Sequence, residues 1–279
     1  MEGIVGTRGM SKSLRSSAVK ITRGLYAPQE PTPLELAHIV TKHWPDLALD
    51  GYSAANLYLG KPLRFPLQLA RKNGLSNTRF FQCRRAKPVG AATRQGIRVC
   101  NPLQITEIMG EEDATYFLEE HFAGPRGHEL VHTAKKDFHR LTLHSQRALD
   151  TAVIGADSHP ERQLSKALRT YFDVRNNVRL AGYRWDVFIE KHNIAIEVDG
   201  FAHHRRDDRR QFEIDHHKLN DASLAGYRLL RFTATTIEFH LGYAVDQVRA
   251  LAAGRHPTSQ PPWQWHWLWR HENDPYNAL

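Results

Sequence analysis

Two acidic residues in the C-terminal half of the chain have the types and spacing for metal-dependent chemistry. Asp186 lies in the apolar run YRWDVFI (183–189), and Glu197 lies in the apolar run IAIEVD (194–199). Both runs have the composition of strands, with a short reversal around Lys191 between them. If a two-residue turn joins them into a hairpin, Asp186 lies directly opposite Glu197, and Asp199 shares a face with Glu197.

Two carboxylates that face each other across a hairpin repel, because their Cβ atoms are only about 5 Å apart. A divalent cation offsets this repulsion, and Mg²⁺ prefers oxygen-rich sites with one or two carboxylates. The alternative is a structural role, in which Arg184 or another basic residue neutralises the acids. The same register places Arg184 opposite Asp199, and a turn one residue longer would spoil the direct pairing.

Histidines follow the second acid closely. Gly200 leaves the strand end, and His203 and His204 come just after it. An imidazole at that place is suited to act as a general base, to orient a water or to protonate a leaving oxygen. Because the chain holds 17 histidines, most have ordinary roles, and we expect His216 and His217 at the surface of a helix.

The surrounding elements are predicted in the order helix, two or three strands, helix, strand, helix. Ser158 and Glu161 form a capping box that begins the first helix. The buried face of that helix is predicted to carry Leu164, Leu168, Tyr171 and Phe172. A charged helix over about 206–225 ends at Gly226, an apolar strand spans 227–232, and a second capping box at 235–238 opens a last helix.

Taken together, these residues resemble a bacterial domain family of unknown function that is related to the very-short-patch repair endonucleases of the PD-(D/E)XK superfamily. The matching pattern covers about 100 residues and runs through Asp186, Glu197-Val198-Asp199-Gly200-x-x-His203, Asp215…Asn220 and residues 226–232. The resemblance implies an α/β fold, with a restriction-endonuclease-like mixed sheet flanked by helices. It also implies a Mg²⁺-dependent phosphodiesterase site, at which Mn²⁺ is expected to substitute, and DNA as substrate.

The resemblance also assigns roles by position. Asp186 and Glu197 correspond to the two acids of the superfamily motif and, with Asp199, are the expected metal ligands. Glu161 stands where some relatives place an additional acid. The usual lysine should stand two residues after Glu197, where this chain has Asp199. This departure moves the proton-handling role to His203 or His204.

The first half of the chain is strongly basic. Residues 1–110 carry 16 Lys and Arg against 6 Asp and Glu, whereas the remainder carries 22 against 24. A basic half favours a polyanionic partner, because binding to phosphates releases counterions. In the second half, Arg184, Arg228 and Arg231 are candidates to contact DNA, although strand arginines paired with acids are an equal alternative.

The first half is also predicted to contain helices over 33–44, 53–58, 111–122 and 144–154, with strand-like segments between 67 and 99. Residues 23–26, 53–55 and 99–103 resemble, more faintly, the antitoxin-like proteins of AbiEi-type abortive-infection systems. In that family a small DNA-binding domain comes first, and a nuclease-like domain is often fused behind it.

We therefore expect three regions: a basic α+β region (1–155), a nuclease domain (156–255) and a Trp-rich tail (256–279). The tail places Trp263, Trp265, Trp267 and Trp269 on one face of a strand, either packed on the protein or free to stack on bases.

The expected function is a Mg²⁺-dependent DNA endonuclease, and the alternative is an inactive DNA-binding regulator or antitoxin. The chain has only two cysteines and no apparent secretory signal, which favours the cytoplasm. It has no apolar run long enough to span a membrane. A homodimer is left open.

Overall fold

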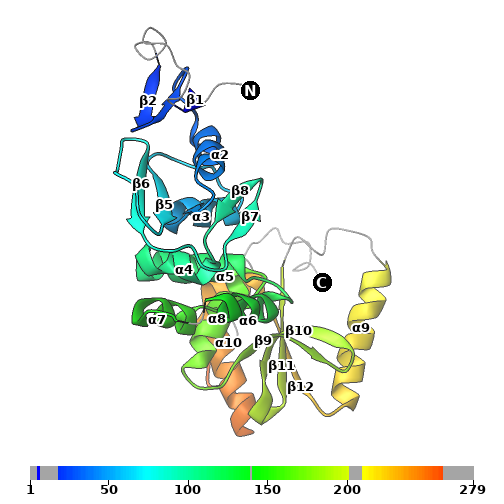
Figure 1. The fold of residues 1–279 in the computed structure, drawn as a ribbon. Coiled ribbons are helices and arrows are strands. Elements are labelled where there is room, and N and C mark those ends of the chain that lie inside the picture. The colour runs from blue at the N-terminus through cyan, green and yellow to red at the C-terminus, as the bar shows by residue number, and fades with distance from the viewer. Residues whose placement is uncertain (1–4, 7–17, 139, 201–208, 260–279) are drawn as a thin grey trace, which may run out of the picture. The chain divides into compact units, whose positions relative to one another are not determined.

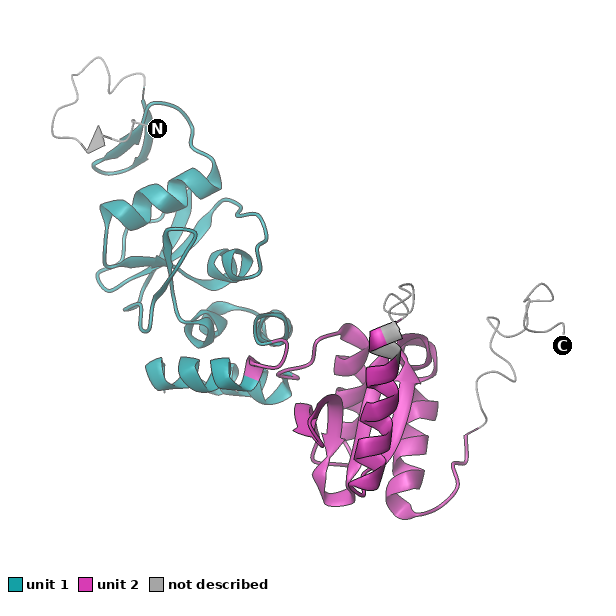
Figure 2. Cartoon of the chain, turned by 90° about the vertical axis from the view of Figure 1, so that its right-hand side faces the viewer, with its two compact units in different colours: residues 1–122, 128–152 teal, residues 123–127, 153–279 magenta. Residues whose placement is uncertain are grey.

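The computed structural model describes residues 5–6, 18–138, 140–200 and 209–259, and the chain divides into two compact units (Figure 2). Unit 1 comprises Met1–Phe122 and His128–Ala152, and unit 2 comprises Ala123–Gly127 and Val153–Leu279. Within the described ranges, no helix is long and apolar enough to cross a membrane.

Unit 1 begins with a small antiparallel sheet in the order β1-β3-β2. Its strands are β1 (Val5–Gly6), β2 (Val19–Thr22) and β3 (Leu25–Ala27). Arg23 and Gly24 join β2 to β3 in a tight turn, where Gly24 has a φ of 85°, a left-handed conformation that glycine adopts without steric cost. Ile21 and Leu25 are buried, so one side of this hairpin contributes to the core of the unit.

A mixed five-stranded sheet in the order β6-β5-β4-β8-β7 forms the centre of unit 1 (Figure 1). Its strands are β4 (Leu47–Leu49), β5 (Leu67–Arg71), β6 (Phe81–Arg85), β7 (Ala92–Arg94) and β8 (Ile97–Val99). The helices are α2 (Pro33–His43), α3 (Gly51–Tyr58), α4 (Pro102–Ile105), α5 (Glu111–His121), α6 (Gly127–Asp137) and α7 (Leu143–Thr151), with a 3-10 turn η1 (Thr106–Ile108) after α4. The helices and strands predicted for the first half are confirmed; α2 begins at a complete Thr32–Glu35 capping box and ends before Pro45.

A buried ion-pair network ties the end of β6 to the helical part of unit 1. Arg84 donates from Nε to Asp50 at 2.8 Å and from Nη1 to Glu107 at 2.7 Å. Asp50 is fully buried, and burial raises the pKa of its carboxyl even beside Arg84. Removing the guanidinium would leave the buried Asp50 unpaired, so this network fixes β6 against the start of α3 and against η1.

Unit 2 is a four-stranded mixed sheet in the order β12-β11-β10-β9, covered by helices on both faces. Its elements are α8 (His159–Arg169), β9 (Arg175–Leu180), β10 (Tyr183–Ile189), the 3-10 turn η2 (Glu190–His192), β11 (Ile194–Asp199), α9 (Arg209–Leu224), β12 (Arg228–Thr233) and α10 (Ala234–Ala253). Neighbouring strands are antiparallel, except that β11 and β12 are parallel. The predicted element order and α/β class are confirmed.

Two apolar clusters hold the sheet of unit 2 between its helices. On one face, Val187, Ile189, Ile194 and Ile196 pack with residues of α8 and α10, such as Leu164 and Val248. On the other face, Trp185, Phe188 and Ala195 pack with Leu219 and Ala222 of α9. The alternation of Ile194, Ala195 and Ile196 between the faces is the period-two pattern of a strand buried on both sides.

Two local predictions for unit 2 are wrong. Tyr171 is 50% exposed, because α8 ends at Arg169 and the chain has left the helix before Tyr171. The last helix begins earlier than the predicted 235–238 capping box. Its N-cap is Thr233, whose side chain accepts a hydrogen bond from the Thr236 N–H at 3.1 Å. Because β12 continues to Thr233, strand and helix follow each other directly.

The N-cap of α10 can be tested by substitution. Thr233→Ala removes the acceptor for the Thr236 N–H and should lower the free energy of unfolding by about 1 kcal/mol. Thr235→Ala is the matched control, because Thr235 lies inside the helix, where alanine is favoured. Urea unfolding of the two variants measures the difference, and equal losses would contradict Thr233 as the cap.

Candidate active site

The two acids of the sequence motif lie at the same level of the β10–β11 hairpin. Val187 pairs with Ile196 and Ile189 pairs with Ile194, and this register, continued by one position, sets Asp186 opposite Glu197. The regular ladder stops at Val187. Beyond it, the Asp186 side chain accepts a hydrogen bond from the Val198 N–H at 2.8 Å through Oδ2. The carboxyl of Asp186 is thus tied to the strand that carries Glu197.

The turn of this hairpin has four residues rather than the predicted two. Residues 190–193 form a 3-10 turn closed by the Asn193 N–H, which donates to the Glu190 carbonyl at 3.1 Å. Asn193 has a φ of 51°, in the left-handed region that asparagine tolerates better than most residues. A four-residue turn removes one residue from each strand, so the predicted register survives although the predicted turn type is wrong.

An irregularity in β9 sets the place of Asp186. Asn177 has a φ of 53°, and the β9–β10 pairing skips the position where Asn177 would meet Asp186. Trp185 and Val187 consequently pack on opposite faces of the sheet, although they are two residues apart. The Asp186 carbonyl, which has lost its ladder partner, accepts a hydrogen bond from the Asn176 side chain at 3.2 Å.

Glu161 is the third acid at this place. It lies in the first turn of α8, is 5% exposed, and accepts a hydrogen bond from the Asp157 N–H at 2.9 Å. The Ser158 side chain caps the helix as predicted, but Glu161 turns back to Asp157 instead of to the Ser158 backbone. Burial raises the pKa of the Glu161 carboxyl, and its charge in turn raises the pKa of Asp186.

Burial and mutual repulsion make both motif acids hard to ionise. Burial is the main cause that raises the pKa of Asp186 to about 6, and the charge of Glu161 adds to it. Burial likewise raises the pKa of Glu197 to about 7, with the charge of Asp186 as the second cause. Carboxylates with elevated pKa values in contact with one another are a recurrent sign of functional sites.

Lys218 of α9 is the cation that reaches this pair, and no pattern in the sequence indicated it. Its ammonium forms an ion pair with Oε2 of Glu197 and lies 4.5 Å from the centre of the Trp185 ring. The hydrogen bond and the charge of Lys218 lower the pKa of Glu197 but do not outweigh its burial. Lys218 is 21 residues away in sequence, and only a three-dimensional arrangement of α9 over β10 and β11 reveals it.

The other residues selected from the sequence have separate partners. Asp199 forms a two-bond ion pair with Arg231 of β12, at 2.7 and 3.0 Å, and Arg184 pairs with Asp157 at 3.3 Å. The expected pairing of Arg184 with Asp199 is therefore not formed. The Arg228 guanidinium donates to the carbonyls of His192 and Leu251, where it joins the hairpin turn to α10.

Two of the predicted site residues, His203 and His204, lie outside the described residues, as do the four tail tryptophans. His216 and His217 are exposed on α9, in agreement with prediction. In the described ranges, no group of three His, Cys, Asp or Glu side chains has the arrangement of a metal site. What the structure brings together is Glu161, Asp186, Glu197 and Lys218.

The elevated pKa values predict how stability depends on pH. Because the folded state binds the Asp186 proton more tightly than the unfolded state, stability falls as pH rises from about 4 through the folded pKa of about 6. A shift of about two pKa units corresponds to about 3 kcal/mol. Asp186→Asn should therefore match the parent near pH 4 and be more stable by about 2–3 kcal/mol at pH 8.

Denaturant unfolding in EDTA at both pH values measures this difference. Glu190→Gln is the matched control, because Glu190 is exposed at the turn of the same hairpin and pairs with Arg175. A pH-independent difference between Asp186→Asn and the parent would contradict the burial of this carboxyl.

The chain was compared with known families, curated proteins and solved structures. No model of a known protein family matches the chain, and no curated protein matches it. Among solved structures, the catalytic domain of the homing endonuclease I-Bth0305I is similar at 19% identity and a TM-score of 0.30, over 35% of this chain and 97% of that domain.

Proposed function

We propose that unit 2 is a Mg²⁺-dependent endonuclease that hydrolyses phosphodiester bonds in DNA, with Asp186 and Glu197 as its metal-binding acids. The observation that carries this proposal is the buried acid pair. Two carboxyls on adjacent strands, each with an elevated pKa, destabilise the folded chain at neutral pH. Such an arrangement is expected where the charge serves a function rather than the fold.

The donor set fits a hard divalent cation. Within the described part of the chain, the Val198 N–H uses one oxygen of Asp186 and Lys218 uses one oxygen of Glu197. The second oxygen of each acid remains for a cation, and Mg²⁺ is commonly held by one or two carboxylates together with waters and phosphate. A bound Mg²⁺ would supply Lewis-acid stabilisation of charge on the scissile phosphate and a lower pKa of an attacking water.

The chain's own residues supply orientation and positive charge. The Lys218 ammonium has three N–H donors and uses one on Glu197, so two remain for a non-bridging phosphate oxygen. The Trp185 ring beneath it restricts where the ammonium can lie. Asn176 and the Val198 N–H fix the backbone and the carboxyl of Asp186. His203 or His204 is proposed to handle protons.

The finer assignment rests on sequence resemblance. The pattern from Asp186 to Phe232 supports a place near the very-short-patch repair endonucleases, which also lack the usual lysine after the second acid. An AbiEi-like role of the first half, binding DNA ahead of the nuclease unit, is proposed on the same basis. This chain has Asp199 at the position of the usual lysine. In this proposal Lys218 provides the positive charge that the usual lysine would supply.

A second candidate is an inactive DNA-binding regulator that keeps the nuclease fold. The observation that favours it is the pairing of the acids: Lys218 on Glu197 and Arg231 on Asp199. If these pairs are permanent, they neutralise part of the cluster without a metal. The variant Lys218→Met separates the two candidates. If the protein is an enzyme, the variant should lose the cleavage activity of the parent. If it is a regulator, neither the parent nor the variant should cleave DNA, and the variant should keep the DNA affinity of the parent.

The enzyme is tested by cleavage of supercoiled plasmid with Mg²⁺ or Mn²⁺. Asp186→Asn and Glu197→Gln remove one metal-binding charge each, and we expect each to lower the rate by at least about 100-fold. Glu190→Gln, the same change at the turn of the hairpin, should keep the rate of the parent. Thermal unfolding should show stabilisation by Mg²⁺ in the parent and not in Asp186→Asn.

Activity of the parent that is equal to that of both acid variants would indicate a contaminating nuclease and overturn the proposal. Lack of cleavage together with lack of Mg²⁺-dependent stabilisation would favour the regulator.

A further inference from the structure

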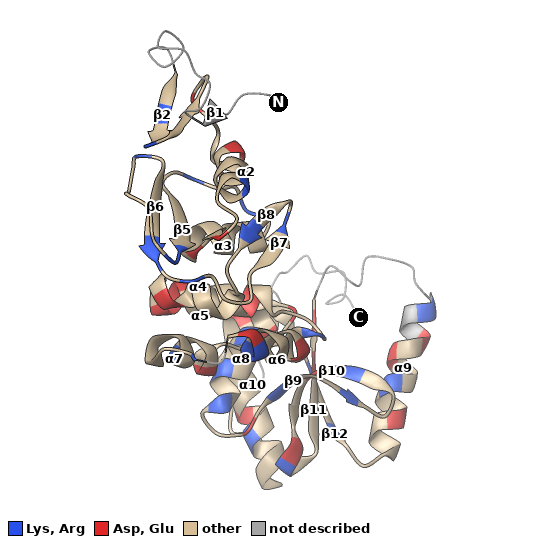
Figure 3. Ribbon diagram, viewed as in Figure 1, with Lys and Arg blue, Asp and Glu red and all other residues tan. Residues whose placement is uncertain are grey.

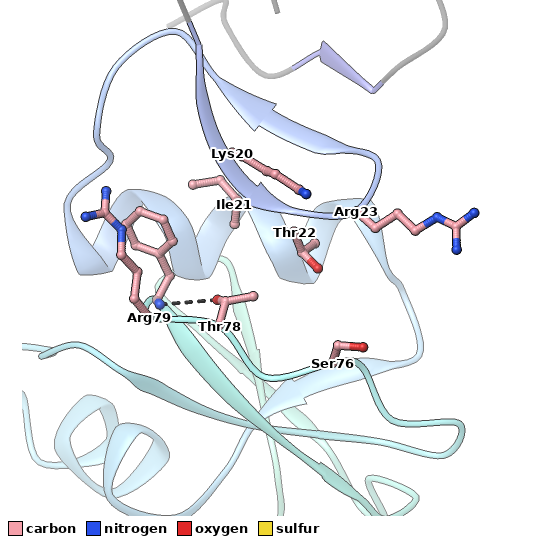
Figure 4. A pocket seen from close by; sticks show the side chains of 8 residues that line it. Lys20, Ile21, Thr22, Arg23, Ser76, Thr78 and Arg79 are labelled. Atoms are coloured by element: carbon pink, nitrogen blue, oxygen red, sulfur yellow. Dashed lines mark hydrogen bonds between the residues drawn. The ribbon is translucent and has the colours of Figure 1, made fainter. Parts of the chain in front are cut away.

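A pocket of about 400 Å³ lies in unit 1 between strand β2 and the loop that leads into β6 (Figure 4). Its lining residues are Lys20, Ile21, Thr22, Arg23, Ser76, Thr78, Arg79 and Phe80. Three of these side chains are cationic, three are hydroxyls, and none is acidic. The pocket belongs to a different unit from the acid pair, and of its lining residues only Arg23 lies in a segment that the sequence motifs singled out.

The cationic side chains at this pocket are only partly neutralised by acidic partners. Within the described residues, neither Lys20 nor Arg23 forms an ion pair, and both are exposed. Arg79 stacks on the Phe80 ring at 4.5 Å and pairs with Glu30 at 3.0 Å. Three cations around one space repel one another, and a bound anion removes that repulsion.

The hydroxyl groups are placed to donate to an anion. The Thr78 oxygen accepts hydrogen bonds from the Phe80 N–H at 3.2 Å and from the Phe81 N–H at 3.3 Å, so its own proton is directed elsewhere. Figure 4 shows Thr22 and Thr78 facing each other across the space between the hairpin and the loop, with Ser76 on the loop beside it; Arg23 and Arg79 start at the two sides of the space and extend outward. Hydroxyls combined with Lys and Arg are the usual donors to phosphate oxygens.

We infer that this pocket binds a phosphate of the DNA backbone; the choice of DNA rests on the proposed function. The surroundings favour an extended polyanion, because the basic residues of unit 1 continue along the strands and loops of its central sheet (Figure 3). The aromatic residue of the lining argues against a base. Phe80 is 2% exposed and lies under Arg79, so it offers no ring face for stacking.

The test measures binding of a fluorescein-labelled 20-base-pair duplex by anisotropy, in EDTA. Lys20→Ala with Arg23→Ala removes two exposed cations of the pocket. We expect about tenfold weaker binding near 0.1 M salt, and a slope of log K against log salt that is smaller by about 2. Lys42→Ala with Lys87→Ala, two exposed lysines of unit 1 outside the pocket, is the matched control and should change binding by less than about threefold.

A substitution that should strengthen DNA binding tests the same pocket. Glu30→Gln removes the acid that pairs with Arg79, so the duplex should bind about two- to fourfold more tightly. Glu112→Gln, an exposed acid on α5, is the control and should leave the affinity unchanged. The two pocket variants and their two controls change only exposed side chains, and an unchanged melting temperature verifies that unit 1 is folded.

Equal losses in the pocket and control double variants would overturn the inference, because they would mean that only overall charge matters. It would also be overturned if tripolyphosphate at the protein's concentration displaced the duplex, or if an RNA hairpin depended on Lys20 and Arg23 while the duplex did not. Binding in EDTA needs no acid pair. A pocket-dependent affinity without plasmid cleavage would therefore support the pocket and reject only the enzyme.

Discussion

The arrangement of unit 2 depends on the cost of burying two carboxyls at neighbouring positions of an apolar hairpin. Asp186 and Glu197 lie where the β10–β11 ladder ends, and the loss of water there raises the pKa of each acid toward neutrality. The burial of apolar residues on both faces of the sheet stabilises the folded state and offsets this local cost. The neighbouring polar contacts then determine which carboxyl oxygens are held and which are left for a ligand.

Several elements converge on this one place. The side chain of Asn176 supports the backbone of Asp186, and the Val198 N–H holds its carboxyl. Lys218 approaches Glu197 from α9, across Trp185, whereas Glu161 approaches from α8. Since α8 and α9 pack on opposite faces of the sheet, the acid and the cation reach the hairpin from opposite sides, and the site is assembled only when all three layers are in place.

The part of this site that could be predicted from sequence is the part set by local pattern. Period-two alternation and an even-numbered turn suffice to align Asp186 with Glu197, even though the turn has four residues. Lys218 could not be predicted, because its position depends on how α9 packs over the strands. The left-handed Asn177, which breaks the β9–β10 pairing beside Asp186, also left no pattern in the sequence. For Arg231, which parallel pairing places next to Glu197, the sequence left DNA contact and pairing with an acid as equal alternatives, and the structure pairs it with Asp199.

The charges around the hairpin show why protonation and the proposed metal binding would relieve the same electrostatic repulsion. Glu197 and Asp199 each have a cation as partner, whereas Asp186 and Glu161 each accept a neutral backbone N–H. A backbone N–H stabilises a carboxylate but does not cancel its charge, so about two negative charges remain when all four acids are ionised. Protons bound with elevated pKa values reduce this excess at low pH. Above the pKa of about 7 the excess is restored, and one divalent cation carries the charge that matches it. If the acid pair holds Mg²⁺, as proposed, its affinity for the ion should rise with pH between about 6 and 8, because protons and metal compete for the same oxygens.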